Sequence, residues 1–192
     1  TATLVMIGYR NASLISVKEG TVLDKVSTGL GMNYLIDVIK NHLSIYIPIS
    51  DVLAVIEKAG VGIYEDEDEM LSEREAVFKI LSPLVSTSTI VASREAQLEE
   101  LRAAIADARS EFVNTLYSWM NPLIPLHNDL MVFCGGTAHY LSPELKKFAD
   151  LRGCGFLQDD FIKIPARIDS MGLKERLTDV YCYFSLMCRS EE

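Results

Sequence analysis

The chain has 192 residues, of which 49% are hydrophobic and 23% charged, and its formal net charge is -9 at pH 7. This length and content are enough to bury one substantial core, as a single domain or as a domain with an insertion. The negative charge argues against direct binding of nucleic acid, because phosphate backbones are bound by clustered Lys and Arg. No apolar run reaches the roughly 18 residues of a membrane helix. We expect a cytoplasmic protein without a membrane partner.

The cysteines and histidines do not have the spacing of a metal site. None of the four cysteines forms a C-x-x-C pair, and the three histidines share no ligand spacing with them. We therefore expect reduced thiols and no metal ligand within the chain. Thr1 already lies in the lead-in to a strand, so we also expect a further segment upstream.

Three segments at the start of the chain have the pattern of β-strands joined by tight turns. Leu4–Ile7 is a continuous apolar run, Ala12–Val17 alternates in part, and Thr21–Ser27 alternates less cleanly. Gly8–Asn11 and Glu19-Gly20 contain residues that favour turns. The sequence therefore predicts an antiparallel three-stranded meander.

A helix is predicted next, over Asn33–His42, because apolar residues recur there at helical spacing and Asn33 can cap it. The preceding Gly29-Leu30-Gly31 step could approach a phosphate closely. The complete dinucleotide-binding and Walker patterns are both absent, so this step by itself does not establish a phosphate site.

Residues 44–90 differ in character from the segments around them. Ser50-Asp51 can cap a short helix over Val52–Lys58, and Ser72 begins a capping box for a second short helix that runs through Leu81. Strand periodicity is replaced here by short capped helices. The change indicates a separate structural unit.

An acidic run, Glu65–Glu69, lies within this segment. We interpret it as a solvated loop. An acidic docking site or a metal loop is the alternative, although the spaced ligands of a calcium loop are absent. We expect residues 1–43 and 91–192 to form the core domain, with residues 44–90 inserted as a small subdomain.

Ser93–Met120 carries the longest helical pattern, and Pro122 and Pro125 end it. Its apolar residues alternate steps of three and four positions. A coiled-coil seam and a single helix packed across a sheet give the same stripe, and we favour the packed helix.

The stretch Asp129–Leu145 combines a strand, a glycine turn and the start of a helix. Leu130–Cys134 is apolar and too short for a helix, and Gly135-Gly136 follows it directly. Ser142 ahead of Pro143 is typical of an N-cap followed by a proline at the first helical position. Ligands of open α/β sheets bind outside the carboxyl ends of strands, so the glycine pair is a candidate binding turn. A plain tight turn is the alternative.

After this stretch the sequence predicts a helix over Pro143–Leu151, a short strand over Phe161–Ile164 and a last helix over Leu173–Met187. The whole chain then reads as three antiparallel strands, a helix, an insertion, a long helix, a strand, a helix, a strand and a helix. That order is typical of a ribonuclease-H-like domain. We expect an α/β fold with a mixed sheet.

Three motifs in this order resemble domain II, the C-terminal half, of bacterial actin homologues of the ParM/StbA plasmid-segregation type. Leu4–Gly20 is similar to the family's second phosphate hairpin. Leu130–Leu141 resembles its adenosine motif, in which a hydrophobic strand and a Gly-Gly turn lie against the base and ribose. Phe161–Leu173 looks like the closing segment before the final helix. The resemblance spans nearly all of the chain and implies an actin-like ATPase domain.

The resemblance implies that the full-length protein binds ATP with Mg²⁺ between two halves and polymerises into filaments that move plasmid DNA through an adaptor protein. It also implies that this chain lacks the N-terminal half and is not active alone, although the full-length protein would be an ATPase. The site residues carried over by the resemblance approach the phosphates or line the adenosine pocket. They are Gly8, Asn11 and Ser13 for the phosphates, and Gly135, Gly136 and Thr137 for the adenosine.

One position departs from the family pattern, because Met6 stands where the phosphate hairpin has an aspartate. Magnesium prefers carboxylate oxygens, and a thioether is a poor partner for it. We therefore expect ATP to be bound but hydrolysed more slowly than by a Met6→Asp variant. Two other function classes stay open. One is an actin-fold scaffold or binding module without hydrolysis, and the other is a fragment of a different superfamily ATPase, such as a sugar kinase or a chaperone.

Overall fold

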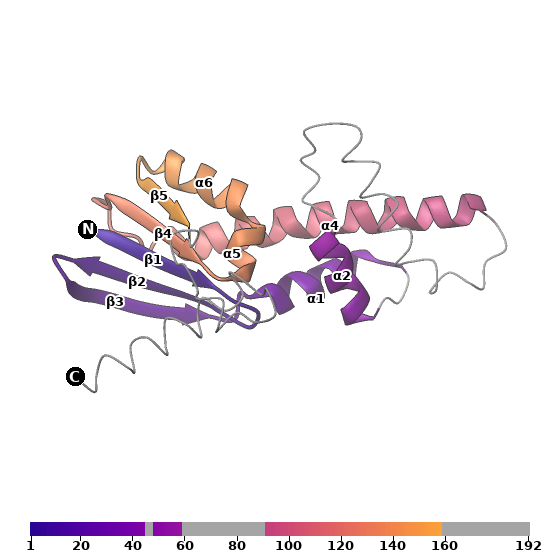
Figure 1. Cartoon of the computed structure of the whole chain (residues 1–192), viewed down its shortest axis with the longest axis horizontal. Helices are drawn as coiled ribbons and strands as arrows, with labels where there is room; N and C mark the ends of the chain where they lie inside the picture. The colour runs from indigo at the N-terminus through magenta and orange to yellow at the C-terminus, as the bar shows by residue number, and fades with distance from the viewer. Residues whose placement is uncertain (45–47, 59–90, 159–192) are drawn as a thin grey trace, which may run out of the picture. The chain divides into compact units, whose positions relative to one another are not determined.

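The computed structural model describes residues 1–44, 48–58 and 91–158 (Figure 1). The chain divides into two compact units, one formed by Thr1–Asn33 with Val113–Glu192 and the other by Tyr34–Phe112. Both boundaries fall inside helices, because α1 (Met32–His42) and α4 (Val91–Met120) each contribute residues to the two units. Whether residues 44–90 form a separate subdomain stays a prediction.

The first unit contains a five-stranded sheet in the order β3-β2-β1-β4-β5. β1 pairs antiparallel with β2 and parallel with β4, β2 pairs antiparallel with β3, and β4 pairs parallel with β5. The strands are β1 (Ala2–Ile7), β2 (Ala12–Lys18), β3 (Thr21–Thr28), β4 (Leu130–Cys134) and β5 (Gly155–Gln158). Only β2 runs against the other four. This mixed sheet, with its strand order and one reversed strand, is an α/β fold of the ribonuclease-H-like class, as the sequence predicted.

The core of the first unit lies on one face of β2, β1 and β4. Val5 pairs with Leu14 on one side and with Phe133 on the other, and all three side chains are fully buried. Burial of such a side chain stabilises the fold by about 1.5–3 kcal/mol. β3 differs, because Val22 and Leu23 are both more than half exposed. The strand at this edge therefore adds little to the core.

The turn between β2 and β3 is set by local chemistry. Glu19 and Gly20 have φ angles of 50° and 80°, and Lys18 pairs with Thr21 across them. A two-residue hairpin loop with two positive φ angles twists with its strands, and glycine adopts this backbone without strain. The prediction of a turn at Glu19-Gly20 is confirmed.

Four of the predicted strands are confirmed, and β4 lies in the interior of the sheet, between β1 and β5. The structure also contains a strand that the sequence analysis did not predict. β5 is Gly155–Gln158, a segment of four residues that begins with glycine and has no apolar run that periodicity could detect. The predicted strand Phe161–Ile164 lies outside the described residues. So do the acidic run Glu65–Glu69 and the last helix, Leu173–Met187.

Within the described residues the helix predictions hold except at three caps. Ser50 and Asp51, predicted to precede a helix, lie inside α2 (Ile49–Lys58). The predicted short helix from Ser72 through Leu81 lies outside the described residues.

Asn33 is inside α1 rather than before it, because Met32 already belongs to the helix. Ser142 is the first residue of α6 (Ser142–Leu151), whose N-cap is Leu141. The Ser142 hydroxyl donates instead to the side-chain oxygen of Gln158, at 2.5 Å. This bond ties the start of α6 to the end of β5, so the predicted capping role of Ser142 was wrong.

The second unit is built on α1 and α4, with α2 (Ile49–Lys58) between them in the sequence. The rings of Tyr34 and Phe112 lie 6.0 Å apart. The backbone N–H and the hydroxyl of Ser44 both donate to one carboxylate oxygen of Glu100, at 2.7 and 2.5 Å. These two bonds lower the pKa of the Glu100 carboxyl. No helix in the described ranges is long and apolar enough to cross a membrane.

Candidate functional site

The candidate site is built where the parallel strands β1 and β4 end side by side. Met6 pairs with Cys134, so the turns that follow them, at Gly8 and Gly135, leave the same edge of the sheet. Gly135 has a φ of 98°, and a Cβ atom on it would lie 2.6 Å from the Ile7 carbonyl oxygen. Only glycine fits such a backbone and such a space. The two turns therefore pack backbone against backbone.

Thr137 fastens the second turn to the first. Its hydroxyl donates to the Gly8 carbonyl oxygen at 2.9 Å, and its side chain is almost completely buried. The backbone N–H of Met32 donates to the same oxygen at 3.1 Å. Thr137 belongs to the short helix α5 (Gly136–Tyr140), which begins directly after Gly135. The Gly-Gly step is thus both a turn and the start of a helix.

The turn between β1 and β2 is held by its surroundings. The backbone N–H of Gly8 donates to the Asn11 carbonyl oxygen at 2.9 Å, and the N–H of Asn33 donates to the Tyr9 carbonyl oxygen at 2.9 Å. A Cβ atom on Gly31 would lie 2.5 Å from the Tyr9 oxygen and from the Arg10 carbonyl carbon. Gly31 therefore lets the turn lie directly on the loop that precedes α1.

These bonds use several groups that could otherwise hold a phosphate. Backbone N–H groups in a turn and at a helix start are the usual phosphate donors. Here the N–H of Gly8 donates a hydrogen bond within the hairpin, and the N–H groups of Met32 and Asn33 donate to carbonyl oxygens of the turn. The possible phosphate cradle at Gly29-Leu30-Gly31 therefore gains no free donor from these two residues of α1. Asn11, by contrast, is exposed.

The remaining predicted phosphate residue lies on the sheet itself. The hydroxyls of Ser13 and Ser27 are 2.8 Å apart and hydrogen-bonded. Ser13 pairs with Met6 across β1 and β2, and the Met6 side chain is half-buried. The predicted binding roles of Gly8, Asn11 and Ser13 stay predictions. Their positions, however, are close in the fold, because all three lie in or beside one turn.

The described residues do not fit a directly bound Mg²⁺ ion. Neither the β1–β2 turn, nor residues 29–31, nor residues 135–141 contain an Asp or a Glu. Within the described ranges, no three or more His, Cys, Asp or Glu side chains gather into a possible metal site. Hard cations are held by carboxylate and carbonyl oxygens. The edge at β1 and β4 is therefore without the usual ligands for magnesium.

Glu144 is the first acidic residue after the Gly135-Gly136 turn, and it lies in the first turn of α6, in contact with Tyr117. The Tyr117 hydroxyl donates to the backbone oxygen of Glu144, and its ring lies 4.5 Å from that of Phe148. Burial, and to a smaller extent the Glu144 charge, raise the pKa of Tyr117 to about 12. These contacts join α4 to α6.

Sequence reasoning found Gly8, Gly135 and Gly136 from their place at strand ends. It missed the close packing of Gly31 on the turn and the bond from Thr137 to Gly8. Neither leaves a local signal, because the partners are far apart in the chain. The spacing of Gly29 and Gly31 was noted, but as a phosphate cradle rather than as a packing site.

No protein-family model matches the sequence, and no curated protein sequence matches it. Two similar solved structures are component A of (R)-2-hydroxyglutaryl-CoA dehydratase from Acidaminococcus fermentans and the ethanolamine utilization protein EutJ from Carboxydothermus hydrogenoformans. The first is 15% identical with a TM-score of 0.40, and the match covers 83% of this chain and 55% of that one. The second is 13% identical with a TM-score of 0.40, and the match covers 82% and 43%. The chain spans about half the length of these proteins, and a likeness of this degree says nothing about what it binds.

Proposed function

We propose that this chain is the nucleotide-binding C-terminal half of an actin-like ATPase of the ParM/StbA plasmid-segregation type. The observation that supports the proposal most is the meeting of two glycine turns at the carboxyl ends of β1 and β4. Ligands of open α/β sheets bind at such an edge. The motifs that resemble the phosphate hairpin and the adenosine motif contain these same two turns.

In the complete protein, ATP with Mg²⁺ would bind between this half and an N-terminal half. Because this edge lacks acidic ligands, any magnesium would be held by the other half. The complete protein would assemble into filaments and reach its cargo through an adaptor protein. The isolated chain would bind nucleotide weakly and would not hydrolyse it.

The first experiment maps adenosine binding on this chain by two-dimensional NMR of its backbone amides. We expect adenosine to shift the signals of Gly135, Gly136 and Thr137. Gly20 supplies an internal control, because it lies in the β2–β3 turn, at the opposite end of β2 from Gly8. No shift at millimolar adenosine, or shifts that include Gly20 equally, would contradict the proposal.

The second experiment tests assembly with the complete protein. Nucleotide-dependent pelleting is expected for a filament-forming ATPase. A protein that binds ATP but neither pellets nor hydrolyses it would favour the scaffold or binding module, which Met6 and the absence of acids in residues 8–11, 29–31 and 135–141 support. An upstream sequence typical of a sugar kinase or a chaperone would favour the third class.

A further inference from the structure

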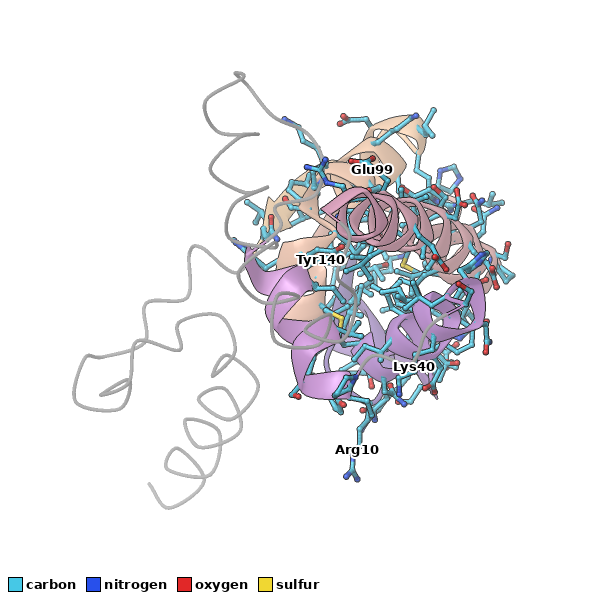
Figure 2. All side chains as sticks on the ribbon, turned by 90° about the vertical axis from the view of Figure 1, so that its right-hand side faces the viewer. Arg10, Lys40, Glu99 and Tyr140 are labelled. Atoms are coloured by element: carbon cyan, nitrogen blue, oxygen red, sulfur yellow. The ribbon has the colours of Figure 1, made fainter. Side chains whose placement is uncertain are left out.

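Arg10 lies at the tip of the turn between β1 and β2, next to Asn11. Both residues are exposed, and Figure 2 shows the Arg10 side chain projecting away from the ribbon. Within the described part of the chain, no carboxylate forms an ion pair with it. The turn thus presents a solvated guanidinium group at the edge of the sheet where the two glycine turns meet.

The backbone that carries Arg10 is fixed on both sides. Gly8 and Asn11 close the hairpin through a bond of 2.9 Å, and the Tyr9 carbonyl oxygen accepts from Asn33. Gly31 packs directly against the backbone of Arg10, where a residue with a side chain would not fit. A fixed backbone that carries an exposed side chain is well suited to binding, because little backbone order has to be gained when a ligand arrives.

Three backbone donors near the β1–β2 turn are already used within the fold. The backbone N–H groups of Gly8, Met32 and Asn33 donate hydrogen bonds to carbonyl oxygens of the turn. No acid is present in the turns to hold a bridging cation. Arg10 is the only Lys or Arg in residues 8–11, 29–31 and 135–141. Among these residues, Arg10 is therefore the one side chain that offers a phosphorylated ligand a permanent positive charge.

We propose that Arg10 binds the phosphate groups of the nucleotide directly, in the place of a metal ion held by this half. The assignment rests on the proposed function. A guanidinium group is always charged and can donate two parallel hydrogen bonds to one phosphate. The Asn11 amide, beside it on the turn, can donate a further bond. Arg10 therefore distinguishes ATP and ADP from adenosine, whereas the Gly135-Gly136 turn contacts what all three share.

The test compares the affinities of this chain for adenosine, ADP and ATP in a buffer with EDTA, by calorimetry or by amide shifts. We expect wild-type protein to bind ATP more tightly than adenosine without a divalent cation. Arg10→Gln should weaken ATP binding about 10- to 100-fold, as the loss of charged hydrogen bonds does. It should leave adenosine binding unchanged, and Arg10→Lys should restore part of the affinity for ATP.

Lys18→Gln is the matched control. Lys18 is an exposed cation beside the other turn of the meander, at the far end of β2, so its loss changes the net charge equally. We expect no change in either affinity. The Arg10 side chain makes no hydrogen bond to the described residues, so we expect its replacement to leave the fold unchanged. Thermal unfolding of each variant checks this.

Each other outcome overturns a defined part of the argument. If Arg10→Gln still binds adenosine and prefers ATP over adenosine as strongly as wild type does, the role of Arg10 is overturned and the proposed function is not. ATP binding that disappears in EDTA and returns only with Mg²⁺ would show a bridging metal and overturn the direct contact. Equal loss of adenosine and ATP would make Arg10 structural. Wild-type protein that binds neither ligand would overturn the proposed function itself.

Discussion

The amino and carboxyl ends of β1 and β4 satisfy their buried polar groups in different ways. At the amino ends, side chains do so: the Thr3 hydroxyl donates to the Asn128 side-chain oxygen at 2.8 Å, and the Asn128 amide donates to the Leu130 carbonyl at 3.0 Å. The Cys154 thiol donates to the Asn128 backbone oxygen at 3.1 Å. Thr3, Asn128 and Cys154 are all buried.

At the carboxyl ends most of these bonds are made by backbone groups, with the Thr137 hydroxyl as a further donor to the Gly8 carbonyl oxygen. Glycine lies at the two closest approaches. Gly135 lies on the Ile7 carbonyl and Gly31 lies on the Tyr9–Arg10 backbone.

At the amino ends, the buried side chains of Thr3, Asn128 and Cys154 bond to one another or to the backbone. The glycine edge leaves Arg10 and Asn11 exposed. The comparison indicates that exposed polar side chains lie at the carboxyl edge, where we propose ligand binding, whereas the buried polar groups at the amino edge stabilise the fold.

The largest effect is expected from Gly135→Ala. The new Cβ would lie 2.6 Å from the Ile7 oxygen, and the φ of 98° is unfavourable for alanine. We expect the free energy of unfolding to fall by roughly 3 kcal/mol. Gly20→Ala is the control, because Gly20 also has a positive φ but has nothing within 4 Å of the added Cβ. It should cost about 1 kcal/mol. Equal losses in urea unfolding would show that the close approach to Ile7 does not matter.

At the amino edge, Asn128→Ala should be nearly as costly. The change leaves the buried Thr3 hydroxyl without its acceptor and the Leu130 carbonyl without the amide donor. Unsatisfied buried groups of this kind cost about 1–3 kcal/mol. Asn121→Ala removes an exposed amide that accepts from Arg152 and should cost about 0.5 kcal/mol. Urea unfolding of both variants compares them, and a similar small loss would mean that the amino edge is not a closed network.

A change at Tyr117 tests the packing of α6. This helix begins near the end of β5, and the Tyr117 hydroxyl bonds to its first turn. Burial, followed by the Glu144 charge, raises the pKa of Tyr117 from 10.0 to about 12. The folded state therefore holds this proton more tightly than the unfolded state. Its contribution to stability is complete below pH 10 and is lost as the pH rises through about 12.

We expect a Tyr117→Phe variant to lose less stability than wild type between neutral pH and pH 11. Chemical unfolding at several pH values measures this. The same alkaline loss in both proteins would assign it to other groups.

The smallest effect is expected at Ser16, in the middle of β2. Its hydroxyl is buried, and no described group hydrogen-bonds it. Ser16→Ala removes an unsatisfied polar atom, so stability should stay the same or rise by up to about 1 kcal/mol. Ser13→Ala removes a hydroxyl that is bonded to Ser27, and a small loss is expected there. A clear loss at Ser16 in thermal unfolding would reveal a partner for its hydroxyl.

The sequence by itself determined the elements whose signals are local. The apolar run of Leu130–Cys134, the alternation in Ala12–Val17 and the glycine pair at Gly135 predicted two strands and a turn that the structure contains. The order of elements predicted the ribonuclease-H-like class. Each of these signals lies within a few residues, where periodicity and turn chemistry act.

Only the tertiary structure decided which distant groups meet. β5 is recognised by its pairing with β4 rather than by its own four residues, and Ser142 binds Gln158 instead of capping a helix. Gly31 lies under the Tyr9–Arg10 turn because α1 donates to that turn. Such contacts depend on how β1 and β4, far apart in the sequence, pair in the sheet. Local propensity carries no information about that pairing, so the polar groups left for a ligand became visible only in the folded chain.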